Sequence, residues 1–231
     1  MISIILNSRK RIELLKNLLS SISRTVSDLS NIEVLINLDS DDTESIDLIN
    51  SIRSSLQFNC RALIADRIDN MMKRINISAS EAVGDYIFIL NDDVQFETYY
   101  WDLKIDFDPN KVLYIGTNDN SIDKEGGKQY SSFPILTRAA YNALGRFMCE
   151  EFVGLGADVH LWRIFNEIGR ITHCDIDLDH ILHRTVDAVL SPDQTAAEMR
   201  KNSWSTPVNC WTLDISKDVE RLKNEIESRM L

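Results

Sequence analysis

The sequence lacks long apolar runs, a secretory signal and closely spaced cysteine pairs. No segment of the 231 residues approaches the ~20 apolar residues that a membrane-spanning helix needs. The opening "MISIILNSRKR" has a short apolar stretch with its basic residues after it, which is the reverse of a secretory signal. The four cysteines show no CxxC spacing, so we expect free thiols in a reducing compartment. These absences predict a cytoplasmic protein without a transmembrane segment.

Positive charge is also scarce. A net charge of −11 argues against a nucleic-acid polymer as partner, because such proteins carry a basic footprint. It leaves room for an anionic small ligand, since a bound divalent metal can invert the local field. A hydrophobic fraction of 44% with 26% charged residues is typical of a globular domain with a true core.

The common catalytic signatures are absent as well. The sequence contains no GxxxxGK[ST] loop, no GxGxxG after its first strand-like segment, no GxSxG elbow and no HExxH. These absences argue against a P-loop enzyme, a dinucleotide-binding Rossmann domain, an α/β-hydrolase and a zinc protease.

What is present is an alternation of strand-like and helix-like segments over residues 1–105. Helical periodicity follows each of the first three strand-like runs, which predicts a parallel sheet with helices on its faces. The predicted strands are Ile2–Leu6, Ile32–Leu38, Cys60–Asp66 and Tyr86–Leu90.

The residues that follow these strands are mostly acidic. The four strand ends read "NSRKR", "LDSDD", "DRIDN" and "NDDV". In open α/β sheets the ligand crevice lies beyond the carboxyl ends of the strands. Adjacent carboxylates raise each other's pKa unless a cation neutralises them, and Mg²⁺ or Mn²⁺ is the usual one. Turn and helix-cap chemistry explains each motif singly, but the coincidence of three favours a ligand site.

Two further features lie in the second half of the chain. "GLGADVHLWR" places Asp158 at the start of a helix, where it can act as a general base or simply complement the helix dipole. All four histidines follow residue 159, and His180 or His183 could complete a metal site begun by Asp93.

Taken in order, these segments resemble the GT-A fold glycosyltransferases, specifically the large inverting family 2. "VLINLDSDD" matches an acidic nucleotide-binding turn, "NISASEAVGDYIFILNDDV" a helix, apolar strand and D-x-D motif, and "FVGLGADVHLWR" a Gly-rich loop before a helix. The resemblance covers roughly residues 2–185 and implies an α/β GT-A fold with a mostly parallel central sheet flanked by helices. It implies a glycosyltransferase domain at 1–185, with a nucleotide-sugar half at 1–105 and an acceptor half at 106–185, and a helical extension at 186–231.

The resemblance also implies roles for individual residues. Asp158 becomes the catalytic base. Asp93, with His180 (or His183), becomes a ligand of Mn²⁺ or Mg²⁺. The nucleotide-sugar contacts that it implies are Asn7, Arg9, Asp39, Asn76, Asn91 and Asp92.

The implied activity is metal-dependent, inverting transfer of a sugar from a nucleotide diphosphate sugar to a hydroxyl of a glycan, lipid or protein. Asn91 stands at the first acid of D-x-D, and Ala157 where a Glu usually precedes the base. These departures support an alternative, a catalytically silent module that binds a nucleotide or sugar. A phosphatase or nucleotidyltransferase is disfavoured by the "NSRKR" strand end and by the lack of an N-terminal Gly-rich loop. The charged last helix is compatible with a homodimer contact.

Overall fold

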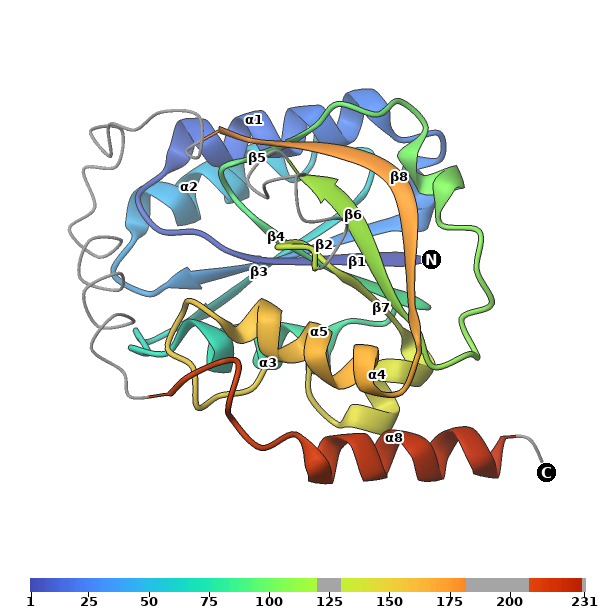
Figure 1. Cartoon of the computed structure of the whole chain (residues 1–231). Helices are drawn as coiled ribbons and strands as arrows, with labels where there is room; N and C mark the ends of the chain where they lie inside the picture. The colour runs from blue at the N-terminus through green and yellow to red at the C-terminus, as the bar shows by residue number, and fades with distance from the viewer. Residues whose placement is uncertain (120–129, 182–207, 230–231) are drawn as a thin grey trace.

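The computed structural model describes residues 1–119, 130–181 and 208–229. Its centre is an eight-stranded sheet with helices on both faces (Figure 1). The strand order is β3-β2-β1-β4-β7-β6-β8-β5.

The first half of the sheet is parallel, as the alternation of segments predicts. β1 (Ile2–Asn7), β2 (Ile32–Asp39), β3 (Asn59–Ala65) and β4 (Tyr86–Asn91) pair in the order β3-β2-β1-β4. The crossover helices are α1 (Ile12–Thr25), α2 (Thr43–Ile52) and α3 (Met71–Glu81). A short 3-10 turn, η1 (Leu29–Asn31), precedes β2.

The second half makes the sheet mixed. β7 (Ile135–Thr137) is antiparallel to both β4 and β6 (Tyr114–Asp119), and β8 (Ile171–His180) is parallel to β6. β5 (Val94–Phe96) adds antiparallel to β8. β5 and β7 therefore run against the other strands. The α/β fold class with a mostly parallel sheet is confirmed.

Alternate side chains of each central strand enter different cores, because successive residues of a strand point to opposite faces. Ile4 and Leu6 of β1 pack in one core with α1 and with the 3-10 helix η2 (Trp101–Lys104), whereas Ile5 packs in the other. That second core lies under α3, α4 (Arg138–Leu144) and α5 (Ala157–Glu167). A strand buried on both faces is apolar throughout, which is why β1, β2 and β4 are readable in the sequence.

The C-terminal helix α8 (Ser216–Ser228) lies along the outside of the α4 and α5 layer (Figure 1). Its apolar residues Val219 and Leu222 are buried in the second core. Among the described helices, none has the length and apolar character that a bilayer-spanning segment requires. Cys60, Cys149, Cys174 and Cys210 form no disulfide in this structure.

Candidate active site

Six parallel strands bring their carboxyl ends to one edge of the sheet. In register, Asn7 of β1 faces Asn37 of β2 and Asn91 of β4, while β6 ends at Asp119 and β8 at His180. We call the charged side chains gathered at this edge the carboxyl-edge cluster: Arg9, Arg11, Asp39, Asp41, Arg74, Asp92, Asp93 and His180.

The loop after β1 directs two arginines to different acids. Lys10 has a left-handed backbone (φ 53°), which is costly for a residue with a Cβ. Its amide donates to Asp42 Oδ2 at 2.7 Å, so the acid that also caps α2 holds the turn. Arg9 then contacts the acids after β2, and Arg11 contacts those after β4.

Asp39 is held by two arginines. Arg9 Nη1 donates to its Oδ2 at 3.0 Å, and Arg74 Nη2 donates to its Oδ1 at 2.9 Å. Arg9 also donates to Asp41 Oδ2 at 2.8 Å. Both oxygens of Asp39 thus accept from guanidinium groups, so a nucleotide that used this carboxylate would share it with an arginine or displace one.

Arg11 makes the corresponding contacts with the two acids after β4. Its Nη1 lies 2.8 Å from Asp92 Oδ1 and its Nη2 lies 2.8 Å from Asp93 Oδ2. Asp92 also accepts from Ser8 Oγ at 2.7 Å, and His180 Nε2 lies 3.4 Å from Asp93 Oδ1. Asp92 and Asp93 are only 1% and 4% exposed, so these contacts replace the solvent that the carboxylates have lost.

The two carboxyl groups titrate in opposite directions. Burial raises the pKa of Asp92 to about 7, against the lowering effect of Arg11 and with a further increase from Asp93. Burial also acts to raise the pKa of Asp93, but the hydrogen bond from His180 and the charge of Arg11 outweigh it and hold that pKa at about 2. Asp93 is therefore the fully ionised member of the pair near neutral pH.

The residues present do not fit the divalent cation that the resemblance implies. A hard cation needs several oxygen ligands that are not already in use. One carboxylate oxygen of Asp92 and one of Asp93 are each in an ion pair with Arg11. Over the described ranges, no three His, Cys, Asp or Glu side chains are arranged to hold a metal ion. His183, the alternative ligand to His180, lies outside the described residues.

Asp158 is the second residue of α5, a helix that begins directly after Gly156, whose φ of 90° suits glycine. The carboxyl group is half-buried, and its burial raises its pKa, against backbone hydrogen bonds at the start of the helix. The charge of Asp119 raises the pKa further. Asp119 ends β6, so a charge at the carboxyl edge of the sheet acts on the carboxyl group at the start of α5. A carboxylate with a raised pKa is suited to proton transfer near neutral pH.

The asparagines predicted as nucleotide contacts have different surroundings. Asn7 donates to Met71 O at 3.3 Å and accepts from Asn37 Nδ2 at 2.7 Å. Asn76, on α3, binds none of the carboxyl-edge cluster. Its amide nitrogen donates to Met148 O at 2.8 Å, and its oxygen accepts from the Met148 amide, also at 2.8 Å. These contacts indicate that Asn76 anchors the loop after α4, and they lend no support to a nucleotide contact.

Asp119, Ser8 and Arg74 are polar residues near this edge that were not singled out from the sequence. Asp119 carried a usable signal, because it ends a strand-like run as Asp39 does. Ser8 and Arg74 carried none: Ser8 is an ordinary loop residue, and Arg74 lies inside an amphipathic helix.

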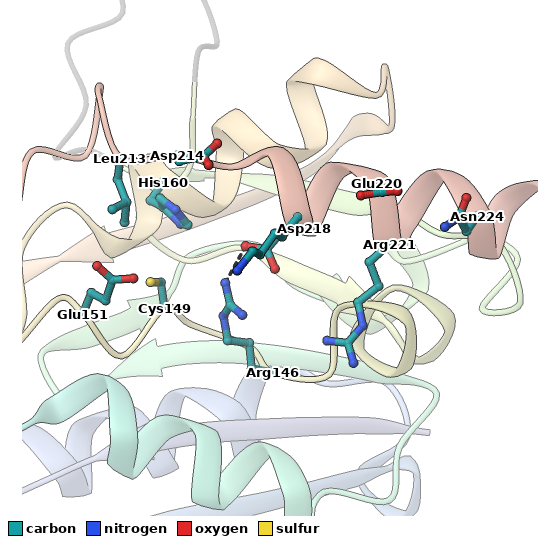
Figure 2. A pocket seen from close by; sticks show the side chains of 11 residues that line it. Arg146, Cys149, Glu151, His160, Leu213, Asp214, Asp218, Glu220, Arg221 and Asn224 are labelled. Carbon is teal, nitrogen blue, oxygen red and sulfur yellow. Dashed lines mark hydrogen bonds and ion pairs between the residues drawn. The ribbon is translucent and has the colours of Figure 1, made fainter.

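A cavity of about 620 Å³ lies elsewhere, between α8, α5 and the loop after α4 (Figure 2). His160 of α5 lines it with an Nε2 that has no hydrogen-bond partner, and Arg146 and Asp218 form an ion pair of 2.5 Å beside it. Burial lowers the pKa of His160 to about 4, so its imidazole is neutral at physiological pH. The carboxyl-edge cluster contributes none of the lining residues.

Comparison with known proteins identifies the fold. No protein-family model and no curated protein matches the sequence. Among solved structures, the mannosyltransferase PcManGT from Pyrobaculum calidifontis, in complex with GDP-Man and Mn²⁺, is 11% identical with a TM-score of 0.63, and the match covers 99% of this chain and 74% of that one. S. aureus TarS 1-349 is 12% identical with a TM-score of 0.60, over 98% of this chain and 72% of that one.

A third similar structure is that of GalNAc-T7 with UDP, GalNAc and Mn²⁺. It is 12% identical with a TM-score of 0.62, and the match covers 97% of this chain and 54% of that chain. Together these likenesses establish the GT-A fold for this chain, in agreement with the expectation from the sequence.

Proposed function

We propose that this GT-A fold chain is a glycosyltransferase that moves a sugar from a nucleotide diphosphate sugar to an acceptor hydroxyl with inversion. The observation that carries the proposal is that the charge of Asp119, which ends β6 at the same edge as the carboxyl-edge cluster, acts on Asp158. A carboxylate with a raised pKa suits proton transfer from the acceptor, and the arginines of the cluster suit a diphosphate.

The reaction is a single displacement. Asp158 takes the proton of the acceptor hydroxyl while that oxygen forms a bond to the anomeric carbon. The bond from the anomeric carbon to the diphosphate oxygen breaks on the opposite face, and the nucleoside diphosphate leaves with the electron pair. Attack opposite the leaving group inverts the anomeric configuration. General-base catalysis of this kind contributes roughly 10²–10⁴-fold to the rate.

The nucleotide would lie over the ends of β1, β2 and β4. We expect Asp39 and Asn91, which end β2 and β4, to contact the base and ribose, and Arg9 to contact phosphate once a ligand competes for its acids. Structural neighbours are crystallised with UDP-GlcNAc, with UDP or with GDP-Man, which supports a nucleotide-sugar donor. The resemblance implies Mn²⁺ or Mg²⁺, which the contacts of Asp92 and Asp93 with Arg11 do not fit, and no step above depends on a metal ion.

The decisive experiment measures release of nucleoside diphosphate from UDP- and GDP-sugars with pooled sugar, lipid and peptide acceptors. We expect Asp158→Asn to lower the release rate about 10²–10⁴-fold while nucleotide affinity is retained. Asp175→Asn, which neutralises an exposed acid of β8, is the matched control and should leave the rate unchanged.

Two other results would decide against this proposal. Nucleotide binding without release under any acceptor condition would instead support the silent binding module. Absence of binding by UDP, GDP and dTDP in a folded protein would remove the nucleotide-sugar site altogether.

A further inference from the structure

The contacts of Arg11 carry an inference about how the diphosphate is held, which rests on the proposed function. We infer that the guanidinium of Arg11 takes the position of the divalent cation at Asp92 and Asp93, and that it binds the donor diphosphate without a metal ion.

The first argument is geometric. A cation that links Asp92 and Asp93 to a diphosphate must contact both carboxylates. It must also present positive charge to the diphosphate. Arg11 contacts both, at 2.8 Å each, and 17% of its side chain remains exposed. A guanidinium has five donors in a planar fork, and this fork suits the paired oxygens of a phosphate.

The second argument is competition. A divalent ion bound to Asp92 and Asp93 would lie in contact with a guanidinium of the same sign, and like charges at such distances repel strongly in a buried site. The ion would have to displace Arg11 from two carboxylates that are almost fully buried.

The third argument is that Arg11 is held in place before any ligand arrives. The Lys10 amide fixes the loop on Asp42, and Arg11 itself is the residue from which α1 begins. The loop therefore holds the guanidinium in a fixed position. Binding of the nucleotide then costs little side-chain entropy at Arg11.

The experiment is calorimetric titration of UDP and GDP into the full chain, in EDTA and then in Mn²⁺. We expect one of them to bind in EDTA with an affinity that Mn²⁺ leaves unchanged. Arg11→Met should weaken that binding about tenfold or more, because a charge-assisted contact is lost. Arg24→Met, at the exposed far end of the same helix, is the matched control and should bind as wild type does.

A second readout follows Mn²⁺ alone by electron paramagnetic resonance. Wild type should leave the ion free, whereas Arg11→Met, shown by circular dichroism to be folded at the assay temperature, should bind it through the released carboxylates. Nucleotide binding by wild type that disappears in EDTA and returns with Mn²⁺ would overturn the inference while leaving the proposed function intact. Absence of nucleotide binding in both conditions would overturn the proposed function as well.

Discussion

The guanidinium of Arg74, in the middle of α3, lies 2.9 Å from the carboxylate of Asp39 at the end of β2. The same guanidinium donates to Leu38 O at 2.8 Å, and the side chain is buried. Arg74 therefore joins a helix on one face of the sheet to the strand end where the nucleotide is proposed to bind. Asp39 is held by Arg74 of α3 and by Arg9 of the loop after β1.

Replacement of Arg74 should destabilise the fold. Arg74→Met removes two hydrogen bonds and leaves Asp39 with one cation fewer at a partly buried position, which should lower the free energy of unfolding by roughly 2–4 kcal/mol. Lys73→Met, on the adjacent exposed position, should change it by less than about 0.5 kcal/mol. Urea denaturation of both variants checks this. If Arg74→Met and Lys73→Met are equally stable, the Arg74 contacts do not contribute to the stability of the fold.

The left-handed residue of the loop after β1 offers a second test. Lys10→Val should destabilise the protein by about 1–2 kcal/mol, because a positive φ is sterically most unfavourable for a β-branched residue. Lys10→Gly adopts this backbone freely and keeps the amide bond to Asp42, so its stability should stay near wild type. If the two variants unfold at the same denaturant concentration, the turn is not under the strain inferred here.

The pH dependence of the proposed transfer tests the environment of Asp158. Burial, and then Asp119, raise the pKa of Asp158, and the base must be deprotonated to work. The rate of diphosphate release should therefore fall on acidification at a higher pH than an ordinary aspartate would allow. Asp119→Asn removes a negative charge, lowers the pKa of Asp158 and should shift this acid limb to lower pH. Asp175→Asn, which changes an exposed acid, should leave the acid side of the pH profile unchanged. If Asp119→Asn and wild type have the same pH profile, Asp119 does not act on Asp158.

The packing of α8 gives a test that needs no ligand. Leu222 is fully buried in the core beside α4, so Leu222→Ala should lower the free energy of unfolding by about 2–4 kcal/mol. Lys223→Ala, one residue further and exposed, should have little effect. The loss should be the same at low and high protein concentration, because the contact is made within one chain. A concentration-dependent melting temperature would instead point to the homodimer contact.

Much of the fold is readable from the chain because each central strand is buried on both faces and so is apolar throughout. β1, β2 and β4 fall within a residue of the predicted segments. β5 was not predicted, since Val94–Phe96 is too short for a periodic signal and exists only by pairing with β8. The reversal of β7 was equally hidden, because strand direction depends on partners that lie far away in the sequence.

The sequence by itself determined that acids and arginines follow the parallel strands, because strand ends and turn residues are local properties of the chain. It also determined that Asp158 begins a helix after glycine. Only the tertiary structure decided that Arg11 pairs with both Asp92 and Asp93, that Arg74 supports Asp39, and that the charge of Asp119 acts on Asp158. Each of these pairs joins residues at least 35 positions apart, and their contact depends on how helices and strands pack rather than on any local preference.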